Sequence, residues 1–493
     1  MSVRDPPLIT KDQAREIVRL VTLSADIATN VEIVNELFGP DYIPGTFTLA
    51  ERKDNPVFLE DDYGGGYESW VRSITRSHLQ VLSRAGLSPV SFDHEYIQAM
   101  GDAVLMVLDS SSETGLPLCE QITNQQVTDV VWRILKVLLY GDPYYPLHVF
   151  RDFNEMGWGL AIALLTEQQM TSPVMALQRS IAAGALGVDI KSQYSAAGPS
   201  PVVHSGIIRM VASNGTLRDL EEIEKDLEAR TAEGLAIDFS QELKQEVMDR
   251  FGPVLLLFFA DDLIETIFDL AVIQLWLEFN DDLTVTVVPR HGQHANDASF
   301  DDVKALLRQP LFGYLASLEQ TRFFVLPNGP AGSGVNAYEL SRSVLRALAS
   351  ADIVILKGAR AYEMFQGLRK VTYFAFNVLR SFTESLVGLD ATGCPRVLVR
   401  QDPGISSFVD FRARACRERK CQSGRNIRVA RMTTVEYAAA LKSSEFARLV
   451  ETRGDRGATI SSIEKEALST GKTLAEAILG PTAIGELGFF ETK

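Results

Sequence analysis

Residues 253–271, PVLLLFFADDLIETIFDLA, join an apolar run to two adjacent carboxylates and then to an amphipathic segment. If the whole stretch is helical, Asp261 and Asp262 form an acidic metal motif inside a helix. If the apolar run is a strand, the two acids mark the corner where a strand passes into a helix, which is where parallel sheets place functional groups. The two interpretations predict different folds and different chemistry.

The sequence that follows favours the strand. Helical patterns separate the first four of five short apolar runs, and parallel strands need crossovers of about a dozen residues. We therefore expect residues 251–493 to form an α/β domain with a doubly wound, mainly parallel sheet, preceded by a mainly helical domain at residues 1–250 with apolar residues at three-to-four spacing. The five runs are PVLLLFFA (253–260), TVTVVP (284–289), RFFVLPNG (322–329), DIVILKG (352–358) and PRVLVRQ (395–401).

The all-helical alternative can be tested against the isoprenoid synthases. Their second metal motif has Ser or Thr four residues after the Asn of an Asn-Asp pair, and Glu four residues further on. Counted from Asn296, these positions hold Phe300 and Lys304. The all-helical interpretation is therefore disfavoured.

Composition excludes several classes of function. The chain has 493 residues and a net charge of −16, which argues against a general nucleic-acid binder because phosphate contacts need clustered cations. Four cysteines are too few for a disulfide scaffold, and no apolar run reaches the roughly 20 residues needed to span a bilayer. We expect a soluble cytoplasmic protein with a small-molecule substrate and with neither nucleic acid nor membrane as partner. The sequence does not indicate an oligomeric state.

Polar residues follow the predicted strands, where loops at the carboxyl ends of a parallel sheet form a crevice. Asp261 and Asp262 follow the first run, and Asn296 and Asp297 follow the second. Carboxylate and amide oxygens of this kind suit a hard divalent cation. Asp262 could instead cap the following helix. Lys357, at the end of the fourth run, could hold a phosphate as a point charge.

Three groups of residues at these strand ends form a recognisable pattern. They are Glu265 with Asp269-Leu270; Asp297; and Lys357-Gly358 with Tyr362 and Gly367-Leu368-Arg369-Lys370. The pattern resembles the damage-control phosphatase family, also called domain of unknown function 89, and most of all its branch related to the acidic-residue methyltransferase protein. The resemblance spans roughly residues 50–410, and the specific matches lie within residues 255–370.

The resemblance implies an N-terminal helical domain, a C-terminal α/β domain and hydrolysis of small phosphorylated metabolites with Mn²⁺, Co²⁺ or Ni²⁺. The oxygen ligands at the strand ends would also suit Mg²⁺. Asp261 and Asp297 are then expected to be catalytic and to bind the metal together with Asn296. The expected substrate-binding residues are Glu265, Lys357, Tyr362 and Arg400.

The sequence departs from the family pattern at ligand-contacting positions. Ala260 stands where a metal-binding Asp is expected, and Ala359 and Ala361 stand where the family has a substrate-contacting Asp and Asn. Loss of an anionic ligand weakens divalent-metal binding. Three functions therefore stay open: a divergent metal-dependent phosphatase or hydrolase of a small metabolite, phosphorylated or not; an enzyme with a changed, non-phosphatase reaction in specialised metabolism; and a non-catalytic binding or scaffold protein.

Overall fold

The computed structural model covers the whole chain and describes most of it. The described residues are 9–22, 25–39, 67–84, 92–111, 115–122, 126–145, 151–167, 172–194, 218–292, 296–329, 336–379, 386–390, 393–405, 432–470 and 472–480, together with Tyr42, Leu87 and Thr383.

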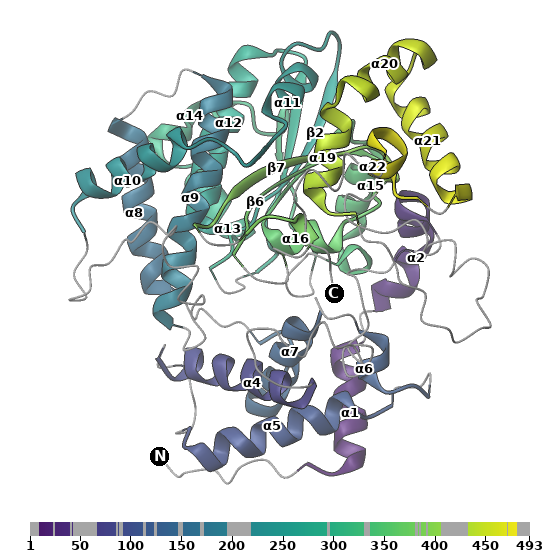
Figure 1. The fold of residues 1–493 in the computed structure, drawn as a ribbon. Coiled ribbons are helices and arrows are strands. Elements are labelled where there is room, and N and C mark those ends of the chain that lie inside the picture. Colours follow the sequence, from purple (N-terminus) through teal and green to yellow (C-terminus); the bar gives the residue numbers. More distant parts are fainter. Residues whose placement is uncertain are drawn as a thin grey trace.

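A seven-stranded sheet forms the centre of the fold, in the order β1-β7-β6-β5-β2-β3-β4 (Figure 1). All neighbouring strands pair in parallel except β6 and β7, which are antiparallel. The prediction of an α/β fold with a mainly parallel sheet is confirmed. The strands are β1 (Ile237–Asp238), β2 (Val254–Phe259), β3 (Leu283–Val288), β4 (Phe323–Val325), β5 (Ile353–Lys357), β6 (Val371–Asn377) and β7 (Arg396–Gln401).

Helices lie between the successive parallel strands, as the alternation of patterns predicted. They are α11 (Ser240–Val247), α12 (Leu263–Phe279), α13 (Phe300–Leu306), η3 (Pro310–Phe312), α14 (Gly313–Ser317), η4 (Ala337–Glu339), α15 (Arg342–Ser350) and α16 (Ala359–Met364). In Figure 1, α12 lies on one side of the sheet and α15 on the other. Helices on both sides explain why β5 is buried along its whole length.

The stretch that decides the fold is a strand followed by a helix. Residues Val254–Phe259 form β2, and Asp262 begins α12 by accepting a hydrogen bond from the backbone N–H of Ile264 at 2.9 Å. Helix α12 is apolar on nearly all sides because it lies between the sheet and a further layer of helices. Asp262 is thus an N-cap, the alternative that the sequence left open.

The N-terminal part is helical, in agreement with the fold class. Its helices are α1 (Lys11–Thr22), α2 (Ala25–Phe38), α4 (Tyr67–Arg84), α5 (His94–Leu108), α6 (Leu118–Gln121), α7 (Val127–Tyr140), α8 (Arg151–Glu167), α9 (Pro173–Tyr194) and α10 (Leu220–Ala232). Helices α8 and α9 pack on α12, and one continuous apolar core joins these helices to the sheet. The expected domain boundary near residue 250 stays a prediction.

The C-terminal helices have a core of their own. They are α19 (Thr434–Lys442), α20 (Ser444–Arg453), α21 (Arg456–Thr470) and α22 (Leu474–Leu479). Tyr437, Phe446 and Ile460 belong to this separate cluster of buried side chains.

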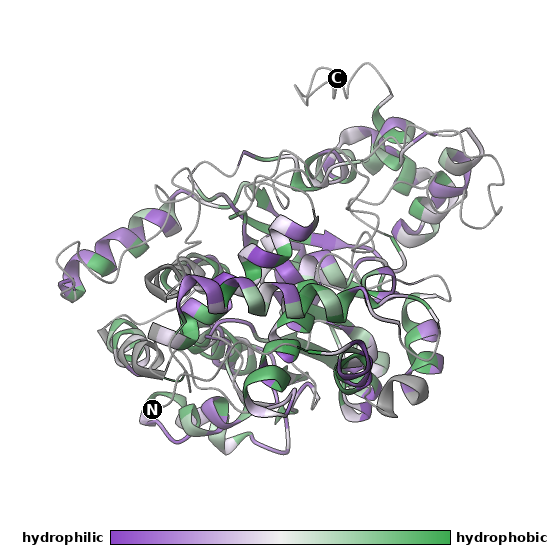
Figure 2. Ribbon diagram, turned by 90° about the horizontal axis from the view of Figure 1, so that it is seen from below, coloured by the Kyte–Doolittle hydropathy of each residue, from purple (hydrophilic) through white to green (hydrophobic). Residues whose placement is uncertain are grey.

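Most helices in Figure 2 carry both hydrophobic and hydrophilic segments, as expected of helices with one buried face. None of the helices within the described part of the chain is both long and apolar enough to cross a membrane.

Candidate active site

Backbone hydrogen bonds tie together the loops that follow β2 and β3. The N–H of Ala298 donates to the carbonyl of Asp261 at 2.7 Å, and the N–H of Leu263 donates to the carbonyl of Asn296 at 2.9 Å. The N–H of Arg290 donates to the carbonyl of Ala298, also at 2.9 Å. The predicted residues Asp261, Asn296 and Asp297 therefore meet at the carboxyl edge of the sheet, which is the edge where the strands β2, β3 and β5 end.

A buried arginine joins the two predicted catalytic carboxylates. Arg290 Nε lies 2.9 Å from Asp297 Oδ2, and Arg290 Nη2 lies 3.4 Å from Asp261 Oδ1. Arg290 and Asp297 are buried, whereas the side chain of Asp261 is 26% exposed. Because the guanidinium group is always protonated, the two carboxylates share one permanent cation that the chain itself supplies.

Asp261 also lies against the backbone of the loop after β5. A Cβ placed on Gly358 would come within 2.1 Å of Asp261 Oδ2. Gly358 has φ +89°, a conformation that favours glycine. The Lys357-Gly358 motif therefore leaves the room that the Asp261 carboxylate occupies, and this explains the glycine.

Lys357 lies at the centre of a second ionic cluster. Its Nζ is 2.7 Å from Glu265 Oε1, 3.0 Å from Asp269 Oδ1 and 2.9 Å from Ser180 Oγ, and its side chain has no exposed surface. Ser180 also hydrogen bonds to Asp269. Helix α9 supplies Ser180 and so covers this cluster. Lys357 and Glu265 thus form an ion pair beneath α9, and the substrate-binding role expected of both stays a prediction.

Burial shifts the pKa values in this cluster. Burial raises the pKa of the Glu265 carboxyl well above its usual range, with Lys357 opposing the shift, and raises that of Asp269 in the same way. Burial alone would lower the pKa of Lys357, but Asp269 and Glu265 outweigh it, so the Lys357 pKa is raised. Two carboxylates that share one ammonium in a buried site favour retention of one proton. The pair Glu265 and Asp269 therefore holds that proton jointly.

Close packing of α9 continues toward the carboxyl edge. A Cβ on Gly184 would come within 2.9 Å of Asn377 Nδ2 and 3.1 Å of Glu265 Oε1. Asn377 Nδ2 also donates to the carbonyl of Ile181 at 3.1 Å. The last residue of β6 and the Glu265 side chain are thus both held against the same turn of α9.

Tyr362 does not reach the carboxylates. It is fully buried, its ring packs against those of Phe374 and Phe376, and its hydroxyl group hydrogen bonds to Thr434 on α19. Its position joins α16 to the C-terminal helices. A substrate-binding role for Tyr362 therefore stays a prediction that these contacts do not favour.

The expectation that Arg400 lies in the same crevice is wrong. Strand β7 is antiparallel to β6, so Arg400 pairs with Tyr373 near the start of β6. The end of β7, where Arg400 lies, is therefore at the edge of the sheet opposite the carboxyl edge. There Arg400 bonds to Glu246 at 3.0 Å and to Asp402. The five predicted runs do not include β6, which lies between the fourth and fifth of them. An antiparallel pair such as β6 and β7 needs no helical crossover.

The Gly-x-Arg-Lys part of the third motif has structural contacts. The N–H of Arg369 donates to the carbonyl of Leu37 at 2.8 Å, and its Nη1 lies near the carbonyl of Glu36, so it binds the C-terminal end of α2. Lys370 Nζ donates to the carbonyl of Ala349 near the end of α15. Cations at helix C-termini are stabilising, which accounts for both residues without a ligand.

The side chains at the carboxyl edge do not fit a divalent metal as they are placed. Asp261 and Asp297 are the expected ligands, and the Arg290 guanidinium group lies on both of them. Asp262 accepts a hydrogen bond as an N-cap, and Ala260 supplies no oxygen from its side chain. Within the described residues, no group of three His, Cys, Asp or Glu side chains could hold a metal ion. His291 is exposed at this edge, and His294 lies outside the described residues.

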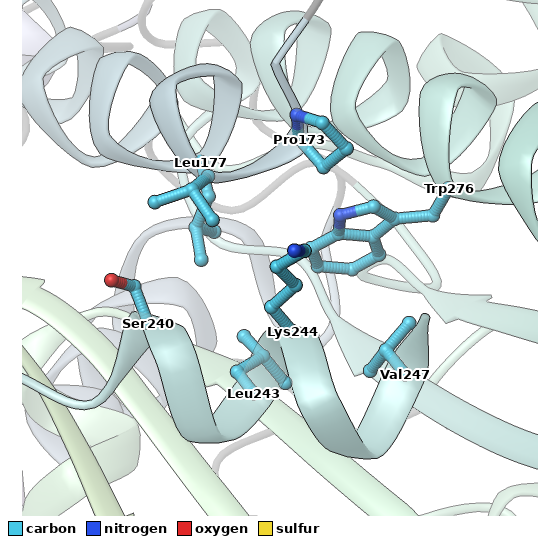
Figure 3. A pocket seen from close by; sticks show the side chains of 8 residues that line it. Pro173, Leu177, Ser240, Leu243, Lys244, Val247 and Trp276 are labelled. Atoms are coloured by element: carbon cyan, nitrogen blue, oxygen red, sulfur yellow. The ribbon is translucent and has the colours of Figure 1, made fainter. Parts of the chain in front are cut away.

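A small groove lies away from this site, between the start of α9, α11 and the end of α12 (Figure 3). Leu177, Leu243 and Trp276 line it, with Lys244 beside them. None of the predicted site residues lines this groove.

Sequence reasoning missed the roles of Arg290 and Ser180. Arg290 carried a signal, because it directly follows the predicted second strand and precedes Asp297 by seven residues in the same loop. Ser180 carried none, because its partners Asp269 and Lys357 are 89 and 177 residues away in the chain.

Comparisons with known proteins agree with the motifs. Residues 212–381 match the sequence model of the damage-control phosphatase ARMT1-like domain, which supports a phosphatase-type or hydrolase-like role in general. Among solved structures, the chain is similar to a DUF89 family protein from Pyrococcus horikoshii, with a TM-score of 0.50 and 16% identity over 67% of this chain and 96% of that chain. At this identity the likeness shows the fold alone. No curated protein matches the sequence. The resemblance read from the motifs is thus confirmed: residues 212–381 match the damage-control phosphatase ARMT1-like domain, and the fold is similar to that of a DUF89 family protein.

Proposed function

We propose that this chain is a hydrolase-like enzyme that acts on a small metabolite at the carboxyl edge of its sheet, by a reaction that differs from metal-dependent phosphate hydrolysis. The observation that carries the proposal is the position of Arg290 between Asp261 and Asp297. The guanidinium group already provides the cation that the two carboxylates require, so their arrangement does not depend on a bound metal.

Asp261 is the reacting group in this proposal. It is the more exposed of the two carboxylates, and Arg290 and the Gly358 backbone fix its position. A fixed carboxylate can accept a proton from a water molecule while the water oxygen attacks the carbonyl carbon of an ester. As the ester C–O bond breaks, the protonated carboxyl group can return that proton to the leaving alcohol oxygen. Asp297 does not take part directly. It is a positioning residue, because it orients Arg290 through a 2.9 Å ion pair.

The charge of the site favours a substrate without a phosphate group. Two carboxylates and one guanidinium leave one net negative charge on these three side chains, and the nearby Lys357 is bound by Glu265 and Asp269. A phosphate monoester is itself anionic near neutral pH and would be repelled. A neutral metabolite meets no such repulsion. This supports the changed reaction that the alanines at positions 260, 359 and 361 first indicated.

Metal-dependent hydrolysis of a small phosphorylated metabolite is the second candidate. It is favoured by the domain match, and by the fact that Asp261 and Asp297, the two expected metal ligands, both contact the Arg290 guanidinium group and so lie close together. It requires Arg290 to leave both carboxylates before a Mn²⁺, Co²⁺ or Ni²⁺ ion could bind there, with the amide oxygen of Asn296 as a further expected ligand.

A two-part hydrolysis screen tests the proposal. Phosphate esters are incubated with Mn²⁺, Co²⁺ or Ni²⁺, with and without EDTA, and neutral chromogenic carboxylic esters are incubated with EDTA alone. We expect hydrolysis of neutral esters that is lost in Asp261→Asn and kept in Asp301→Asn, a matched change at an exposed position on α13. Metal-dependent phosphate release that is lost in Asp297→Asn would instead establish the second candidate. No turnover in either part would contradict both and leave a binding role.

A further inference from the structure

Arg290 occupies the place between Asp261 and Asp297 as part of the fold. Both of its backbone groups are bound to the loop that carries Asp297: its N–H donates to the carbonyl of Ala298 at 2.9 Å, and its carbonyl accepts from the N–H of Phe300 at 2.7 Å. The Arg290 residue is only 5% exposed. The backbone and the guanidinium group of Arg290 thus both contact the loops after β2 and β3, and the buried side chain has little freedom to turn toward solvent.

Backbone contacts also hold Asp261 and Asp297 in place. The carbonyl of Asp261 accepts from the N–H of Ala298 at 2.7 Å, and Asp262 and Asp297 form an isolated antiparallel bridge. The backbone of Gly358 lies close to the Asp261 carboxylate. Backbone contacts therefore place both acids and the arginine, so the three charges are arranged before any ligand arrives.

We infer that Arg290 is a built-in cation that takes the position of the family's divalent metal, so that a metal ion can bind Asp261 and Asp297 only by displacing it. Like-charged groups repel strongly when they are buried, so a divalent ion and a guanidinium group would not share these two carboxylates. The inference concerns cation binding alone and does not require the ester hydrolysis proposed above.

Removal of the arginine charge should create a metal site. In Arg290→Gln the two carboxylates lose their shared cation while their backbone positions are kept by the same hydrogen bonds. Two oxygen ligands with water completing the shell suit Mn²⁺. Removal of the competing charge should tighten Mn²⁺ binding by on the order of tenfold or more, as changes around metal ligands commonly do.

The test is Mn²⁺ titration of the full-length chain, followed by the loss of the free-ion electron paramagnetic resonance signal. Arg308→Gln is the matched control, because it makes the same change at an exposed arginine on the neighbouring segment. We expect the wild type and Arg308→Gln to take up no Mn²⁺ at this site, Arg290→Gln to take up one equivalent, and Arg290→Gln with Asp297→Asn to lose it. Circular dichroism establishes that each variant is folded.

Two results would overturn the inference. One is uptake of Mn²⁺ by the wild type that is as tight as that of Arg290→Gln and is lost in Asp297→Asn. The other is a folded Arg290→Gln that takes up none. If Arg290→Gln does not fold, the wild type with and without Asp297→Asn still decides, because uptake that depends on Asp297 contradicts a built-in cation. Failure of the hydrolysis screen leaves this measurement unaffected, so the two proposals can fail separately.

Discussion

Replacement of Lys357 by methionine tests the buried ionic cluster most severely. The change keeps the length of the side chain but removes the ammonium that lies 2.7 Å from Glu265 and 3.0 Å from Asp269. All three side chains are buried, so no water replaces the lost partner. Removal of one partner from a buried ion pair typically costs about 3–5 kcal/mol. We expect Lys357→Met to lower the free energy of unfolding by this amount at neutral pH.

The pH dependence of this loss follows from the direction of the pKa shifts. The pKa values of Glu265 and Asp269 are higher in the folded chain than in the unfolded chain. The stability linked to their protonation is therefore fully present below the pKa values of the unfolded chain, and it is lost as pH rises through the pKa values of the folded chain. Lys357 opposes both shifts. Without it, the folded chain must hold one more proton, which costs about 1.4 kcal/mol per pH unit. The destabilisation should therefore be small near pH 5 and increase toward pH 8.

Urea unfolding of the wild type and of Lys357→Met at several pH values from 5 to 8 measures both effects. Lys304→Met is the matched control, because Lys304 pairs with Glu319 at a partly exposed position where such a pair contributes about 0–1 kcal/mol. Adding Asp269→Asn to Lys357→Met should remove most of the pH dependence, since one acid no longer needs a proton. A Lys357→Met variant as stable as the control, at every pH, would refute this reasoning.

Three further changes test other parts of the structure. Asp262→Ala removes the N-cap of α12 and should cost about 1 kcal/mol in urea unfolding; an unchanged midpoint would contradict the capping role. Gly358→Ala should lower the melting temperature more than Gly454→Ala. Both glycines have φ near +88°, but of the two only Gly358 would place its Cβ within 4 Å of a carboxylate. Equal effects would contradict the close packing of Asp261. Arg400→Gln should reduce stability without changing the Michaelis constant for any substrate identified in the screen, because Arg400 lies at the opposite edge of the sheet; a raised constant would contradict that position.

The fold could be read from the sequence where local patterns were strong. The apolar runs at residues 253–260 and 352–358 became β2 and β5, and the helical pattern after Asp262 became α12. Strand β6, VTYFAFN, was missed although aromatic and β-branched residues fill it. That omission led to the wrong edge for Arg400, because strand direction depends on pairing with a neighbour rather than on the strand's own residues.

The site could be predicted only in part. The loops after β2 and β3 had to meet at one edge of a parallel sheet, so the proximity of Asp261 and Asp297 followed from topology. The burial of Lys357 did not follow, because helix α9, far away in the chain, covers it and supplies Ser180. The ion pairs of Arg290 also depend on tertiary contacts. Sequence motifs thus located the site, while the pairing of its charges required the structure.

The account depends most on Arg290 being the cation held by Asp261 and Asp297. A crystal structure of the wild-type chain grown with Mn²⁺, with data collected at the manganese absorption edge, tests this directly. We expect the guanidinium group on both carboxylates and no anomalous peak between them. An anomalous peak about 2.2 Å from oxygens of both Asp261 and Asp297, with Arg290 turned away, would contradict it.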